Sequence, residues 1–300
     1  MSNILAGSVP SDMIGTASEF LRKYKAGVIT DDHVRRFVNL DPTPFAVSAK
    51  TAKREIERSA ARTQRKLSAV FKKRIVVDPI PSEFTDENLA YWAMFNMSPV
   101  FLPGEDITQD RVLKGITQRD YVKLNDFFYR NVASGAIKPI HPGLKPTMLR
   151  RGWYLADFTV SVDYTDGTQV FVNDLFAKII SDLRQQKLVG KHENTPMGSR
   201  FSITWDEWQN VVLTYLASKL NVTRAQMRLE RAVEFNAIGN LYDANRGKFS
   251  VWEWSQDYFG GSSRLYGGCR DYGGLACVCY DWRDDRGGRI AGRPLVSFVQ

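Results

Sequence analysis

The first half of the chain carries apolar residues at the spacing of an amphipathic helix. Within residues 46–73 they recur on one helical face, and Leu67 and Phe71 are typical of them. Three further segments repeat this pattern: 16–25, 85–95 and 119–132. We therefore predict a mainly helical region over residues 1–145.

The second half changes in character after a proline-rich break. Pro139, Pro142 and Pro146 interrupt regular structure, so we predict a domain boundary between residues 145 and 146. Residues 153–172 then alternate apolar and polar positions around Asp166-Gly167, which predicts a β-hairpin. Helical patterns follow at 173–188, at 204–220 behind a Thr204–Glu207 capping box, and at 223–233. Because residues 239–300 are typical of short strands and loops, the predicted fold class is α+β.

The net charge of +8 is concentrated in one stretch of the chain. Residues 49–74 hold ten Lys or Arg against two Glu, an excess equal to that of the whole protein. Two interpretations are open: a helix that binds phosphate groups, or a solvated face used in assembly. No aromatic stacking positions interleave with the charge, which favours the second, so we do not expect nucleic acid as a partner.

Signatures of catalysis, metal binding and membrane insertion are absent from the sequence. His33, His141 and His192 are too far apart for a zinc motif, and no P-loop, dinucleotide fingerprint or nucleophile elbow occurs. No run of eighteen apolar residues and no signal peptide is present. The three cysteines cluster near the C-terminus, which argues against a disulfide framework. We therefore predict no cofactor, no metal, no membrane insertion and synthesis in the cytoplasm.

Several short motifs follow one another after residue 146. A Trp-rich helix at 202–220 precedes MRLERAVEFNAIGN at 227–240, and three more motifs follow: VWEW at 251–254, RLYGG at 264–268 and GRPL at 292–295. In this order they resemble the formylglycine-generating-enzyme-like branch of the C-type lectin fold, which implies a C-type-lectin-like domain over residues 146–300. The sequence departs from that family where Phe235 replaces a Trp. Cys277 and Cys279 also do not match the cysteine pattern of the enzymes, so their oxidative chemistry is not implied.

The last forty residues resemble a more specific group of proteins within this fold. Gly267-Gly268, a loop, a strand ending near Trp282, a second loop and a closing Arg293 are similar to the variable proteins of diversity-generating retroelements. Such systems mutate template adenines, most usefully in AAC codons, and a codon ending in C never encodes Lys, Glu, Gln or Met. These four types supply 44 of the 300 residues, yet none occurs from Asp257 to Val299. The composition thus supports a variable region at about 264–290.

The resemblance implies a division between buried and displayed residues, because loops on a rigid scaffold can vary without unfolding it. The expected scaffold residues are Trp252, Trp254, Gly267, Gly268, Trp282 and Arg293. The expected ligand-binding residues are Tyr266, Cys269, Arg270, Asp271, Tyr272, Tyr280, Asp281, Arg283, Asp284, Arg286 and Arg289. Tyr and Arg are typical of binding hot spots, and the six Arg and five Asp of residues 257–299 predict a nearly neutral, polar surface.

These observations predict a ligand- or receptor-binding protein and not an enzyme. Its partner would be a protein or glycan on a cell surface. Residues 1–145 would serve homo-oligomerisation or virion assembly, as in a viral tail or receptor-binding protein, which places the chain on a virion or cell surface. Two alternatives stay open: a formylglycine-generating-enzyme-like oxidase, and a nucleic-acid-binding protein acting through residues 49–74.

Overall fold

The computed structural model describes residues 49–115, 120–138, 140 and 143–299, with side chains from residue 58 onward. The helix predicted at 16–25 lies outside this range. The helices and helical turns are α3 (Ala49–Phe71), α4 (Asp86–Met94), α5 (Asp126–Ala133), α6 (Ala177–Gln185), α7 (Trp205–Glu207), η1 (Trp208–Val212), α8 (Leu213–Lys219), α9 (Ala232–Leu241), η2 (Arg270–Tyr272) and η3 (Gly274–Ala276). The strands are β1 (Met97–Leu102), β2 (Ile137–Lys138), β3 (Gly152–Asp157), β4 (Met227–Leu229), β5 (Trp252–Phe259), β6 (Ser263–Gly267), β7 (Val278–Trp282), β8 (Ile290–Gly292) and β9 (Pro294–Ser297). The predicted α+β class is confirmed.

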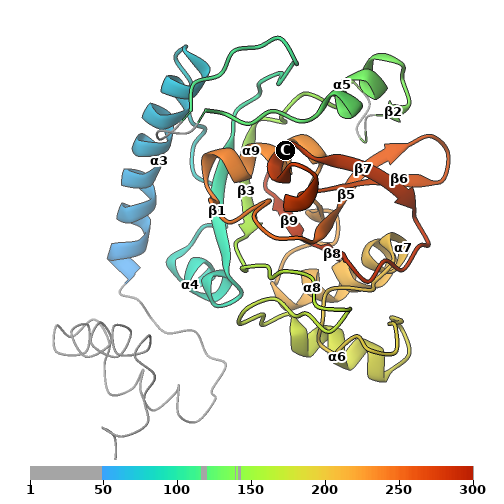
Figure 1. Ribbon diagram of the computed structural model, residues 1–300. Coiled ribbons are helices and arrows are strands. Elements are labelled where there is room, and N and C mark those ends of the chain that lie inside the picture. Colours follow the sequence, from blue (N-terminus) through green and yellow to red (C-terminus); the bar gives the residue numbers. More distant parts are fainter. Residues whose placement is uncertain (1–48, 116–119, 139, 141–142, 300) are drawn as a thin grey trace, which may run out of the picture.

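The strands of the described chain form two sheets. The first has the order β1-β3-β9-β4 and is antiparallel throughout, with every residue of β3 buried. The second has the antiparallel order β2-β5-β6-β7, and β8 joins it in parallel to β5. In Figure 1, α3 lies along one side of the molecule and the β5–β7 sheet lies toward the opposite side.

The two predicted halves share one sheet and one core. β1 comes from the region predicted to be helical, yet it pairs with β3 from Met97↔Asp157 to Leu102↔Gly152. The main hydrophobic cluster runs from Leu67 on α3 to Val296 on β9. The described residues therefore do not separate at residue 145. Pairing with β1 covers an edge of β3 that would otherwise be open, and this favours the joined arrangement.

Helices with a clear capping signal form where the sequence predicts them. The helix over 46–73 is confirmed as α3, and the Thr85 hydroxyl accepts a hydrogen bond from the backbone N–H of Asn88 at 3.2 Å at the start of α4. The capping box is also present, since Thr204 and Glu207 bond to each other's backbone N–H groups. The helix expected over 119–132 is shorter, because Asn125 caps α5 and starts it at Asp126.

Two predictions of local structure were wrong. Asp166 and Gly167 form the expected turn, with φ of 46° and 83°, but the two arms do not pair as a hairpin. β3, the start of the first arm, has its edges occupied by β1 and β9, so no strand ladder forms there. Beyond β3 the arms are joined by a backbone hydrogen bond from the Val172 N–H to the Val160 carbonyl at 2.9 Å. The segment 223–233 is not one helix either. It contains β4, which pairs with β9, followed by the start of α9.

Candidate ligand-binding surface

A buried ionic clasp lies beneath the predicted variable region. Arg293 donates two hydrogen bonds to the Glu253 carboxylate, at 2.7 and 2.8 Å, from a side chain that is 3% exposed. It also donates to the carbonyls of Asp157 and Thr159 at 3.0 and 2.8 Å. The bidentate geometry uses the planar fork of Arg, which Lys cannot reproduce. Arg293 thereby ties β9, β5 and the end of β3 together.

The clasp extends through a second buried arginine. Arg200 is fully buried between Asp157 and Asp174, and its Nε and Nη2 atoms donate to Asp174 at 2.7 Å each. Burial alone would raise the pKa of Asp157, but the charges of Arg200 and Arg293 hold it below its ordinary value. Because two arginines share one buried carboxylate, removing any member would leave an uncompensated charge inside the protein.

Glycine and tryptophan residues fix the backbone above this clasp. Trp254 is buried and its indole N–H donates to the Ile203 carbonyl at 3.1 Å. A Cβ on Gly267 would lie 2.5 Å from the Cys277 carbonyl oxygen. One on Gly268, whose φ is 94°, would lie 2.6 Å from the Phe235 ring. The Gly-Gly pair is therefore required for the close approach of β6 to the following loop.

Strand β7 alternates its side chains between two faces. Tyr280 and Trp282 share one face, and Tyr280 stacks on Phe259 and Phe127 at ring-centroid distances of 4.1 and 5.9 Å. Asp281 lies on the other face, where burial and the neighbouring Asp285 raise its pKa against a hydrogen bond from the Trp282 N–H. Both faces of this edge strand therefore contribute to the surface of the predicted variable region.

The loop after β7 is held down by residues distant in sequence. Arg286 pairs with both carboxylate oxygens of Glu207 at 2.7 Å and donates to the Ser202 carbonyl at 2.8 Å. Desolvation alone would raise the pKa of Glu207, but Arg286 and the backbone N–H groups of Gly190 and Thr204 lower it. The loop is thus fixed to the start of α7, and Arg286 positions the loop from a half-buried side chain.

Most of the predicted ligand-binding residues lie at the surface. The exposed ones are Arg270, Asp271, Tyr272, Tyr280, Arg283, Asp284 and Arg289, and the half-buried ones are Tyr266, Asp281 and Arg286. Tyr266 packs edge-on against Trp252 at 4.8 Å, and Tyr272 lies 5.1 Å from the same indole. Two of the tyrosines predicted to bind ligand therefore pack against the half-buried Trp252.

Two assignments of single residues were wrong. Cys269, expected at the surface, is 0% exposed, because its carbonyl accepts from the N–H groups of Tyr272 and Gly274 and turns the chain so that the thiol points inward. Trp282, expected in the scaffold, is 62% exposed. It lies at the end of β7, beyond Tyr280. Phe127 on α5 covers Tyr280 but does not cover this end of the strand.

The arginines of the predicted variable region have partners that the sequence did not point to. Arg270 lies 3.2 Å from Asp163 and Arg283 lies 3.2 Å from Asp206, while the Arg289 guanidinium lies 4.1 Å over the ring of Tyr164. These three partners come from residues 163–206. These pairs could not be predicted because the partners lie far apart in sequence. The one local signal near them was the capping box at Thr204, which predicts ordered structure around Asp206.

Cys269 and Cys277 offer little reactive thiolate. Burial raises the pKa of Cys277 to about 12 and also raises that of Cys269, so both thiols are protonated near neutral pH. Among the described residues, no group of three or more His, Cys, Asp or Glu side chains is arranged to hold a metal ion. Nor does any described helix combine the length and apolarity needed to cross a bilayer.

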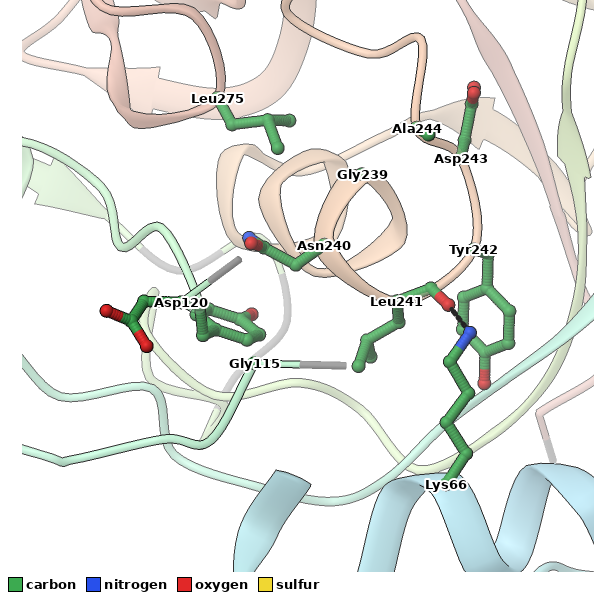
Figure 2. A pocket seen from close by; sticks show the side chains of 11 residues that line it. Lys66, Gly115, Asp120, Gly239, Asn240, Leu241, Tyr242, Asp243, Ala244 and Leu275 are labelled. Carbon is green, nitrogen blue, oxygen red and sulfur yellow. Dashed lines mark hydrogen bonds between the residues drawn. The ribbon is translucent and has the colours of Figure 1, made fainter. Parts of the chain in front are cut away.

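A separate pocket of about 180 Å³ lies at the C-terminal end of α9 (Figure 2). Lys66 reaches into it from α3 and donates to the Leu241 carbonyl, with its ammonium 5.1 Å from the centre of the Tyr242 ring. Burial lowers the pKa of Lys66. A cation at the carbonyl end of a helix is stabilised by the helix dipole, so Lys66 docks α3 onto the body of the protein.

In comparisons with known proteins, no family model, curated protein or solved structure matches the chain.

Proposed function

We propose that the protein binds a ligand through residues 264–290, displayed on a C-type-lectin-like scaffold in the manner of retroelement variable proteins. The observation that carries the proposal is the separation between this surface and the clasp below it. Tyr272 and Asp284 are exposed, whereas Glu253, Arg293 and Trp254 are buried. Such a surface can change its side chains at little cost to the fold.

The path of the chain also supports a lectin-like unit. β3 and β9 pair antiparallel at Leu155↔Val296, so the first and last strands of residues 146–300 lie side by side. Between them lie α6, α8, α9 and the β5–β7 sheet that carries the surface. We extend the proposal to a protein or glycan partner on a cell surface, with residues 1–145 serving oligomerisation or virion assembly. The exposed Arg58, Arg62 and Arg65 of α3 are available for such contacts.

Binding accounts for the site better than the oxidase alternative does. Thiol chemistry needs thiolates, and the raised pKa values of Cys269 and Cys277 keep both thiols protonated in the free chain. A Cys277→Ser, Cys279→Ser variant that lost an oxidase activity of the parent protein would reverse this preference.

The proposal is tested by replacing the displayed residues together. In one variant Arg270, Asp271, Tyr272, Asp284 and Arg289 all become Ala, and it should still unfold cooperatively in urea with a total loss within about 2.5 kcal/mol, since each surface change costs within about 0.5 kcal/mol. The matched variant Glu253→Ala, a single change in the clasp, should by itself cost about 3 kcal/mol or more. Unfolding of the fivefold variant would refute the proposal. At the gene level, we expect a near-copy of the 3′ coding segment, differing at template adenines, beside a reverse transcriptase gene.

A further inference from the structure

The charges of the variable region are not balanced within it. By composition, residues 257–299 are nearly neutral, but the arginines pair mainly with groups outside the displayed segment 264–290. Arg283 pairs with Asp206, Arg286 with Glu207, and Arg293 with Glu253. Arg270, which lies 3.2 Å from Asp163 and 3.6 Å from Asp271, is the arginine that also contacts an aspartate of the segment.

The aspartates around the end of β7 consequently have no cationic partner within the part of the chain that the structure describes. Asp284 makes no side-chain hydrogen bond or ion pair with any residue that the structure describes, and Asp281 accepts from the Trp282 backbone N–H. The Asp285 N–H donates to the Trp282 carbonyl at 3.0 Å, which closes a turn that holds both later aspartates beside Trp282. This corner of a chain whose net charge is +8 is therefore locally anionic.

Trp282 is the exposed tryptophan of this corner. Trp92, Trp153, Trp205 and Trp254 are buried, and each donates its indole N–H to a backbone carbonyl. The Trp282 indole is 62% exposed and makes no ring contact or hydrogen bond with the described part of the chain. Beside it, the turn at Gly260 and Gly261 has open space where a Cβ would lie. The indole is thus accessible and already held on an ordered strand.

We propose that Trp282, Asp284 and Asp285 form the contact point for a basic segment of a protein partner, with a Lys or Arg side chain lying over the indole and its charged end among the carboxylates. Cations are attracted to the face of a Trp ring, and Asp284 and Asp285, which lack a cationic partner among the described residues, provide charge complementarity at the same point. The inference rests on the proposed binding role and names the chemistry of its partner. A neutral glycan, which stacks on indoles without needing carboxylates, is the competing occupant.

The test follows the indole N–H signal of Trp282 by ¹⁵N NMR in the full chain, assigned with Trp282→Phe. The probes are trilysine amide, triglutamate amide and methyl glucoside. Trilysine should shift the signal, and the double variant Asp284→Asn, Asp285→Asn should raise its apparent dissociation constant about threefold or more, as should added salt. The control is Asp166→Asn, which removes one charge from an exposed turn elsewhere and should leave the trilysine response unchanged.

Each remaining outcome overturns the inference. These outcomes are a shift with methyl glucoside or triglutamate in place of trilysine, no shift with any probe, or a trilysine dissociation constant that is unchanged in the double variant. A response to methyl glucoside would still leave residues 264–290 as a binding surface. The proposed function fails separately, through unfolding of the fivefold alanine variant, so the two failures are distinguishable.

Discussion

At the scale of single residues, Arg293 shows why a buried ion pair needs a particular cation. Its fork meets Glu253 with two bonds, while Nη1 also reaches two carbonyls. We predict that Arg293→Lys lowers the free energy of unfolding by about 3 kcal/mol or more, because a point charge cannot make these bonds together. Urea denaturation measures the loss. The control is Arg283→Lys at a half-exposed pair, where we expect a change within about 0.5 kcal/mol.

Glu230 makes the free energy of unfolding of the protein depend on pH. Oε2 pairs with Arg246, whereas Oε1 is buried without a hydrogen-bond partner among the described residues. Burial raises its pKa to about 7 from an ordinary value of 4.5, against the opposing charges of Arg246 and Arg293. The folded state alone holds this proton between pH 4.5 and 7, so the resulting stability is present below 4.5 and is lost as the pH rises through 7.

We therefore predict that, relative to Glu230→Gln, the parent protein loses on the order of 3 kcal/mol of unfolding free energy between pH 5 and pH 8. Subtracting one curve from the other cancels the contribution of the other carboxylates to the unfolding free energy. These include Asp157 and Glu234, whose lowered pKa makes them titrate at lower pH. Urea unfolding at several pH values gives both curves. Parallel curves would show that Glu230 is charged in the folded protein throughout this range.

Individual residues were predictable where backbone geometry leaves one choice. The Gly-Gly pair in the sequence predicts a tight backbone geometry at Gly267 and Gly268. The structure agrees, because a Cβ at either position would collide with a neighbouring group. Trp282 and Cys269 were assigned to the wrong environments. Residue type suggests burial for Trp, but exposure at the end of an edge strand depends on whether another element reaches that position.

At the scale of elements, β7 shows how an edge strand is closed. Its register with β6 directs the backbone groups of Val278, Tyr280 and Trp282 away from the sheet. The Val278 carbonyl accepts from the Asn125 side chain at 3.0 Å, and the Trp282 N–H donates to Asp281 at 2.8 Å. Among the described residues, the Val278 N–H and the backbone groups of Tyr280 are left without such a cap, so the edge offers few groups for pairing with another chain.

Asn125 joins this edge to α5 through both ends of its amide. Its oxygen accepts from the Phe128 N–H at 3.1 Å as the N-cap, while its nitrogen donates to Val278. We predict that Asn125→Ala costs about 2 kcal/mol, whereas Asn125→Asp, which keeps the cap and loses the donor, costs about half as much. Thermal or urea unfolding separates the two. Equal losses would mean that the cap contributes nothing.

Elements were predictable where the signal is local. Thr85 and Thr204 mark helix starts correctly because an N-cap bonds to a backbone N–H three residues away. The hairpin at Asp166-Gly167 was wrong because the turn is local but strand pairing is not. Which strand takes the edges of β3 is decided by β1 and β9, which lie far from that turn in sequence.

At the scale of the whole molecule, the α+β class followed from the pattern of the chain. The division at residue 145 stays a prediction, although in the described residues β1 pairs with β3 across it. Composition changes at Pro139–Pro146, yet the core crosses that point. Phe84 packs on Trp153 at 5.9 Å and on Phe298 at 4.8 Å. A proline-rich break marks a turn in the path, whereas a domain boundary also requires that few contacts cross it.

The shared core leads to the last prediction, which concerns the fragment 146–300. Without residues 49–145, β3 would lose its partner β1, Trp153 would lose Phe84 and Phe101, and Tyr280 would lose Phe127. The exposed β3 edge and aromatic rings favour aggregation, so this fragment should aggregate or unfold without a cooperative transition. The matched fragment 49–300 keeps these contacts and should unfold cooperatively in urea. If 146–300 alone is monomeric and gives a cooperative transition, the predicted boundary is real and the N-terminal elements are an attachment to an independent unit. The outcome also decides whether the variable surface can be moved to another protein with residues 146–300 alone.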